Sequence, residues 1–163
     1  MAREIQLTQG KVAIVDDEDY ERVMQHKWCA VQSYRTWYAT TNIKINGQYT
    51  IKAMHQLIRG KNGTDHIDGD GLNNRRNNLR GCTPGQNAAN NRKHRDGKYS
   101  RYKGVCYQAA GKRLRRWFAR IVVNCKQIYL GFYATGVEAA RAYDVAAIQY
   151  FGEYARLNFP PTT

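Results

Sequence analysis

The sequence predicts an α+β fold with two parts: a small strand–loop–strand–helix module, then a three-stranded antiparallel sheet packed on one helix. Short apolar runs separated by turn residues such as Asn46-Gly47 predict strands and hairpins. Capping patterns at Thr83 and Thr135 predict the starts of two helices. The length of 163 residues fits one domain or two small modules.

Residues 1–53 are expected to form a sheet and helix region that supports the next module. Apolar residues 5–7 and 12–15 flank Gly10 and predict a small hairpin. Asp16 can cap a short helix that runs to about Gln25, and we expect the acidic residues after it to complement the helix dipole.

Residues 54–91 are predicted to form the strand–loop–strand–helix module. Residues 54–59 read as a short helix stopped by Gly60, and residues 64–67 as the end of a strand. Residues 68–71 have turn chemistry, and residues 78–82 can return as a second strand. Thr83, followed by Pro84 and by Gln86, then opens a helix that carries Asn87.

This order of elements can bring Asp65 on the first strand close to Asn87 on the helix. One anionic and one neutral oxygen ligand suit a hard divalent cation, so we expect Mg²⁺, or another such ion as Mn²⁺. His66 follows Asp65 and points to the opposite side of the strand, where an imidazole can take a proton from water. A plain Asn-rich surface loop is the alternative.

Asp65-His66, Asn78 before Leu79-Arg80, and then Asn87 resemble the HNH motif of phage and intron-encoded homing endonucleases, which have a ββα-metal fold. The resemblance implies that Asp65 and Asn87 bind the metal, that His66 is the general base, and that Asn78 holds His66 in place. It therefore implies metal-dependent hydrolysis of DNA phosphodiester bonds, by nicking or by double-strand cleavage. His55 is either a packed histidine or a phosphate contact near this site.

Basic residues concentrate after the first module. The chain has a net charge of +13 and a pI near 9.8, which favours a polyanionic partner. Residues 92–100 read as a basic linker between the modules. The DNA-binding bases expected here and just beyond are Arg92, Lys93, Arg95, Lys98, Arg101, Lys103, Arg113, Arg115, Arg116 and Arg120.

Other classes of protein are disfavoured by the composition. No apolar run approaches the length of a membrane span and no signal peptide is recognisable, so we expect a soluble, cytoplasmic protein of a phage or bacterial host cell, without an obligate protein partner. The four cysteines lack zinc-type spacing, which favours reduced and partly buried thiols.

Residues 101–160 are predicted to form the sheet module. Residues 102–107, 115–123 and 126–130 read as strands, and the helix after Thr135 runs to about Tyr150. Alternation along the middle strand places Trp117, Ala119, Ile121 and Val123 on one face and Arg116, Phe118, Arg120 and Val122 on the other. We expect the helix, through a stripe from Val137 to Phe151, to cover the first face and leave the second open.

Several ordered motifs in this module resemble the Apetala-two/ethylene-response-factor (AP2/ERF) DNA-binding domain of plant transcription factors. They are Tyr102-Lys103-Gly104-Val105, Tyr129-Leu130-Gly131, residues 138–144 and Leu157-Asn158-Phe159-Pro160. The resemblance implies double-stranded DNA as partner, contacted by Lys103, Cys106, Gln108, Phe118, Arg120, Val122, Gln127 and Tyr129. Several of these are arginine in the plant proteins, so we expect a different base sequence to be read.

Together these features predict a site-specific HNH endonuclease placed on DNA by an AP2/ERF-type domain. The rival hypothesis is a non-cleaving transcriptional regulator whose HNH motif is vestigial. RNA binding is a weaker third hypothesis, because the sequence lacks the aromatic signature of an RNA-recognition sheet.

Overall fold

The computed structural model describes residues 1–33, 36–60, 63–93, 100–109 and 116–161. The chain divides into two compact units, Met1–Thr83 and Pro84–Thr163. An α+β fold with antiparallel sheets is confirmed.

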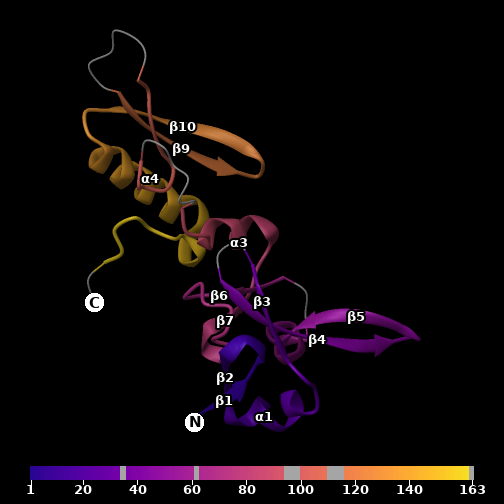
Figure 1. The fold of residues 1–163 in the computed structure, drawn as a ribbon. Helices are drawn as coiled ribbons and strands as arrows, with labels where there is room; N and C mark the ends of the chain where they lie inside the picture. Colours follow the sequence, from indigo (N-terminus) through magenta and orange to yellow (C-terminus); the bar gives the residue numbers. More distant parts are fainter. Residues whose placement is uncertain (34–35, 61–62, 94–99, 110–115, 162–163) are drawn as a thin grey trace. The chain divides into compact units, whose positions relative to one another are not determined.

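The first unit contains three small antiparallel sheets and two helices (Figure 1). Its elements, in chain order, are β1 (Ala2–Gln6), η1 (Thr8–Gly10), β2 (Val12–Asp16), α1 (Asp17–Met24), β3 (Cys29–Gln32), β4 (Trp37–Ile45), β5 (Gln48–Ala53), α2 (Met54–Arg59), β6 (Thr64–His66), η2 (Arg76–Asn78) and β7 (Leu79–Gly81). Strand β1 pairs with β2, β4 pairs with both β3 and β5, and β6 pairs with β7.

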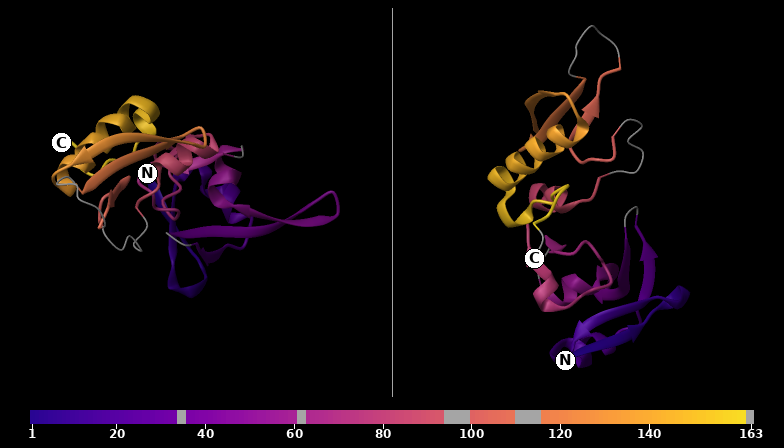
Figure 2. Two further views of the ribbon diagram at one scale, coloured as in Figure 1. Left: turned by 90° about the horizontal axis from the view of Figure 1, so that it is seen from above. Right: turned by 90° about the vertical axis from the view of Figure 1, so that its left-hand side faces the viewer.

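The predicted hairpin turn at Asn46-Gly47 is confirmed. Both residues have positive φ, 49° and 84°, as a type I′ turn requires. The β4–β5 hairpin extends away from the rest of the first unit (Figure 2), and its residues 44–51 are exposed on both faces.

A single apolar core joins the elements of the first unit. Met54 of α2 and Val15 of β2 are fully buried in it, and Trp28 donates its indole N–H to the carbonyl of Val23 at 2.7 Å. The other members of this core are Ile5, Leu7, Ala13, Ala30, Ala39, Ile58 and Leu79. The first turn of β6–β7 is thereby anchored on the N-terminal sheet region.

The second unit consists of one helix, a three-stranded sheet packed on another helix, and a C-terminal turn. Its elements are α3 (Pro84–Asn90), β8 (Val105–Tyr107), β9 (Trp117–Val123), β10 (Lys126–Tyr133), α4 (Gly136–Phe151) and η3 (Gly152–Tyr154). Strand β9 lies between β8 and β10. Thr135 caps α4 as predicted, since its side chain accepts from the N–H of Glu138 at 3.2 Å.

Helix α4 covers one face of the sheet, as Figure 1 shows. Small residues permit this close approach: Ala119 and Ile121 of β9 pack against Ala139, Ala140 and Ala147 of α4. Val137 was predicted in the buried stripe, but it is exposed. Gly136 lies there instead, where a Cβ would come 3.2 Å from the ring of Trp117.

The separated motifs of this unit meet around Asp144. Its buried carboxylate accepts from the N–H groups of Asn158 and Phe159 at 2.8 and 2.9 Å. The amide oxygen of Asn158 in turn accepts from the N–H of Lys103 at 2.6 Å. Gly104 has φ +72°, and any Cβ there would overlap the ring of Tyr143. The recurring residues therefore tie the first strand and the C-terminal segment to α4.

The predicted ββα-metal module is not found as one unit. Strands β6 and β7 belong to the first compact unit and α3 to the second. In the described part of the chain, no helix is both long and apolar enough to cross a membrane. Cys82 and Cys106 are partly buried thiols as expected, but Cys29 and Cys125 are exposed.

Candidate nucleic-acid interface

The face of the C-terminal sheet that α4 does not cover carries cationic, amide and aromatic side chains. On β9 it is formed by Phe118, Arg120 and Val122, which alternate with core residues. On β10 it includes Gln127 and Tyr129. We call this surface, formed by Cys106, Phe118, Arg120, Val122, Gln127, Tyr129 and Phe132, the free face.

A polar pair lies on the free face. Strand register places Arg120 opposite Tyr129, and Val122 opposite Gln127. The guanidinium of Arg120 donates through Nη1 to the amide oxygen of Gln127 at 2.7 Å. Because a guanidinium has five N–H donors, this bond orients Arg120 and leaves donors to recognise a base edge or a phosphate.

Three aromatic rings lie beside this pair. The centroids of Phe118, Tyr129 and Phe132 are 5.5 to 5.9 Å apart, with tilted or edge-to-face geometry. A bulge between Tyr129 and Gly131 allows Phe132 to lie opposite Phe118. The expectation that the sheet lacks an aromatic cluster therefore does not hold for this face.

The other predicted DNA contacts lie in different surroundings. Arg92, Arg101, Gln108 and Arg116 are exposed. Lys93 and Lys103 instead bond backbone carbonyls, those of Ser100 and Ala89, and burial lowers the pKa of Lys93. Arg95, Lys98, Arg113 and Arg115 lie outside the described residues.

In the first unit, Asp65 forms an ion pair with the second strand of its hairpin. Both residues of the pair are largely buried, and Arg80 reaches Asp65 Oδ2 with Nε at 3.1 Å and Nη2 at 3.0 Å. The two residues are also directly opposite in the β6–β7 register. This carboxylate therefore helps to join the two strands.

His66 is buried in a cluster of rings. Its ring centroid lies 4.8 Å from that of His55 and 5.8 Å from that of Tyr38. Its Nε2 lies 3.3 Å from Asn74 Oδ1, while Asn74 Nδ2 donates to the carbonyl of Leu72 at 3.1 Å. The asparagine oxygen thus faces the ring, and Nε2 carries the proton.

Burial controls the charge of both histidines. Desolvation lowers the pKa of His55 to about 4, with a further contribution from neighbouring His66. The pKa of His66 is lowered by the same cause, against the opposing effects of Asn74 and nearby aspartates. Both rings are therefore neutral at pH 7.

Asn78 holds the loop between β6 and β7 closed. Its Nδ2 donates to Asp68 Oδ1 at 2.9 Å and to the carbonyl of Asn73 at 2.8 Å, and its Oδ1 accepts from the N–H of Asp68 at 3.0 Å. The hydrogen bond to His66 comes from Asn74, not from Asn78 as the resemblance implied. The sequence marked Asn74 only as one of a pair of asparagines.

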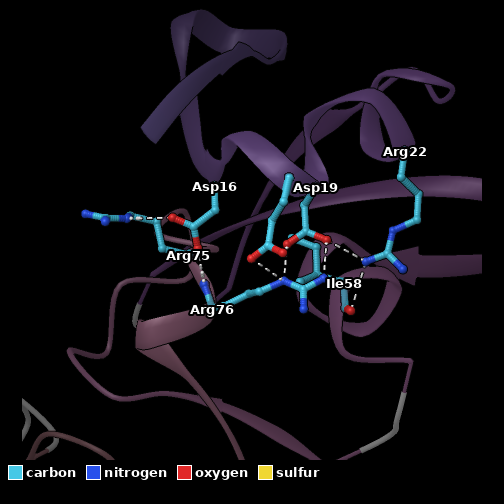
Figure 3. Close-up of polar contacts among 7 residues, drawn as sticks. Asp16, Asp19, Arg22, Ile58, Arg75 and Arg76 are labelled. Carbon is cyan, nitrogen blue, oxygen red and sulfur yellow. Dashed lines mark hydrogen bonds and ion pairs between the residues drawn. The ribbon is translucent and has the colours of Figure 1, made fainter. Parts of the chain in front are cut away.

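Acidic residues at the start of α1 fix the far side of this loop (Figure 3). Asp19 accepts from Arg76 Nε at 2.6 Å and Nη2 at 2.9 Å, and from Arg22 at 2.8 Å. Asp16 accepts from Arg75 Nε at 3.1 Å and from the N–H of Arg76 at 2.7 Å. These acids therefore do more than complement the helix dipole, since they bind a segment about sixty residues further along the chain.

The predicted metal ligands are in different units: Asp65 in the first, and Asn87, which is exposed, in the second. Across residues 1–33, 36–60, 63–93, 100–109 and 116–161, no three His, Cys, Asp or Glu side chains gather in a group that could hold a metal ion. A Mg²⁺ or Mn²⁺ ion shared by Asp65 and Asn87 stays a prediction.

Comparison with known proteins identifies relatives among plant regulators. The chain is 46% identical over 66 residues to APETALA2-like protein 2 of Oryza sativa subsp. indica, covering 39% of this chain and 14% of that protein. It is 50% identical over 62 residues to ethylene-responsive transcription factor WRI1 of Arabidopsis thaliana, covering 37% and 14%. With dehydration-responsive element-binding protein 2E of the same plant it shares 41% over 70 residues, covering 37% and 27%.

These matches support an AP2/ERF-type DNA-binding domain. Their lengths are close to that of the segment from residue 100 to 160, over which the motifs resemble that family. The chain spans about 14% of the length of the first relatives. No family model matches the sequence.

The predicted HNH endonuclease of phage or mobile-element origin is wrong. The relatives are named as transcription factors and a response-element-binding protein, not as nucleases or hydrolases. The physical reason for the error is that Asp65, His66 and Asn78 suggested catalysis by their order, whereas their printed contacts hold strands and a loop together. Their presence therefore requires no catalytic role.

Proposed function

We propose that this chain binds double-stranded DNA through the free face of its C-terminal sheet and acts as a regulator of transcription. The observation that carries the proposal is Arg120, exposed on the face opposite α4 and oriented by Gln127. The names of the AP2/ERF relatives support the same function.

Each group on the free face has a chemical task in this proposal. Arg120 reads a guanine edge, because a guanidinium can donate two parallel bonds to O6 and N7 in the major groove. Gln127 orients it, and Tyr129 and Phe118 supply apolar surface beside it. Arg116 and Gln108 at the sheet edge, with Arg92, Lys93, Arg95, Lys98, Arg101, Lys103, Arg113 and Arg115, contact phosphates or support that edge.

The polar loop of the first unit has a structural role in this proposal. Asp65, His66 and Asn78 stabilise the β6–β7 hairpin, and His55 packs on His66. This region supports the N-terminal unit and carries out no hydrolysis.

Selection from a randomised duplex library with the full chain tests the proposal. We expect a preferred sequence whose affinity falls steeply with salt, because released counterions drive phosphate binding. Arg120→Ala should weaken binding to that sequence, whereas Arg141→Ala, which removes an exposed arginine of α4, should not. Equal binding by wild type and Arg120→Ala would contradict the proposal.

Single-stranded nucleic acid is the second candidate partner, favoured by the three aromatic rings of the free face. The rings pack on one another at an angle, which is less suited to stacking successive bases than separate exposed rings. Competition of the selected duplex with its separated strands and with RNA of the same sequence distinguishes the two. Stronger competition by a single strand would favour the second candidate.

A further inference from the structure

The free face presents an aliphatic side chain among its polar groups. Val122 is 57% exposed, although it lies in the central strand of a three-stranded sheet. Its neighbours Ile121 and Ala119 supply the core contacts of β9 and are 2% and 0% exposed. The apolar surface of Val122 is therefore not used to stabilise the unit.

Val122 lies beside the polar pair of the free face. It is directly opposite Gln127 in the strand register, and Gln127 accepts the hydrogen bond from Arg120. Arg120 and Val122 are two residues apart on one strand and so face the same way. One small patch thus offers a cation, an amide and an isopropyl group.

The spacing of this patch suits successive base pairs. Residues two apart on a strand are separated by about 6.8 Å, and base pairs are stacked at about 3.4 Å. A strand lying along the groove would therefore place Val122 about two base-pair steps from the base that Arg120 contacts.

The chemistry of the major groove then selects the base. Thymine is the base that presents a methyl group there, whereas guanine, cytosine and adenine present hydrogen-bonding atoms at the corresponding edge. An isopropyl group gains by covering a methyl group, but it cannot replace the water bonded to a polar edge.

We infer that Val122 reads the 5-methyl group of a thymine about two base pairs from the base bound by Arg120. This inference rests on the proposed function and deepens it: the target class is a duplex site that pairs a guanine with a nearby thymine. Val122 is then a specificity-determining residue of the free face.

Uracil substitution in the selected duplex tests the inference, because uracil lacks only the methyl group. Each thymine of the bound site is replaced in turn, and affinity is measured for wild type, Val122→Ala and Val145→Ala. For wild type we expect one thymine whose replacement weakens binding about three- to fivefold, the effect of one buried methyl group. For Val122→Ala that penalty should disappear, which is the signature of direct coupling.

Val145→Ala is the matched control. Val145 is 68% exposed on α4, on the other side of the sheet from the free face, so its variant should keep the full uracil penalty. Because both valines are exposed, both variants should unfold at the wild-type temperature.

Two outcomes would overturn the inference while leaving the proposed function intact. In one, no uracil replacement weakens wild-type binding; in the other, the penalty persists undiminished in Val122→Ala. Failure of the full chain to enrich any duplex would instead overturn the proposed function itself, and this inference with it.

Discussion

The two polar regions of this chain use similar residue types in opposite ways. In the loop between β6 and β7, asparagine and aspartate side chains bond one another and the backbone, with Asn78 alone making three such bonds. On the free face of the second unit, Arg120 and Gln127 bond each other and remain exposed. The first arrangement closes a loop, and the second leaves donors for a partner.

The contrast shows which polar residues are available for function. A polar atom that already bonds within the chain contributes to stability, and its loss should lower the free energy of unfolding. A polar atom on an exposed sheet face should affect binding and leave stability nearly unchanged. Substitutions in the two regions should therefore change different measured quantities.

Asp19→Ala should have the largest effect and should be confined to stability. Asp19 is 1% exposed and accepts from both Arg22 and Arg76, and the hydrogen bond from Arg76 is the main cause of its lowered pKa. We expect a loss of about 3 kcal/mol in the free energy of unfolding, measured by urea titration. Asp17→Ala, which removes an exposed pair with Arg3, is the control and should cost under about 1 kcal/mol.

Asn78→Ala should destabilise the same unit by about 2 kcal/mol, because three hydrogen bonds of a buried amide are lost. Asn77→Ala, at the exposed neighbouring position, should be nearly neutral. DNA affinity of both variants, measured at a temperature where each is folded, should equal that of wild type. A large loss of affinity in Asn78→Ala would show that the loop takes part in binding.

The first unit should lose stability in mild acid. The folded pKa of His55 is about 4, below its ordinary value of 6.5, so the unfolded chain binds the proton more readily. The stabilising contribution is complete above pH 6.5 and is lost as the pH falls from 6.5 towards 4. Allowing for partial exposure, we expect roughly 2 kcal/mol over this window.

His55→Phe keeps a ring against His66 but cannot titrate. Its stability, followed by thermal unfolding between pH 7 and pH 4, should fall less steeply than that of wild type. An unchanged slope would assign the acid sensitivity to other groups, His66 first among them.

Arg120→Ala should leave stability unchanged and weaken DNA binding about tenfold. A bidentate arginine–guanine contact contributes about 1–3 kcal/mol of discrimination, and the lower part of that range applies if Gln127 takes over part of the contact. Fluorescence anisotropy with the selected duplex measures the loss. Arg141→Ala should bind as wild type does, and a similar loss in both variants would indicate a general charge effect.

Local sequence signals predicted the elements well. The turn at Asn46-Gly47, the cap at Thr135 and the alternation of β9 depend on neighbouring residues, and the structure confirms all three. The buried position of Val137 was predicted wrongly because its helix packs one position away, through Gly136 and Ala139. Small residues determine that packing, and periodicity alone does not show it.

The candidate site was harder to predict for a physical reason. The order of Asp65, His66 and Asn78 says nothing of whether their polar atoms face a ligand or the chain itself. Arg76 pairs with Asp19 at a separation of 57 residues, which no local pattern reveals. Alternation did place Phe118, Arg120 and Val122 on one face, because side chains alternate along every strand.

One gel measures the central claim most directly: a labelled duplex from the selection is titrated with wild type and Arg120→Ala in the presence of Mg²⁺. The account predicts that wild type retards an intact duplex, that Arg120→Ala retards it only at about tenfold higher concentration, and that no strand is cut. Equal retardation by both proteins, or cleavage that disappears in Asp65→Asn, would contradict it.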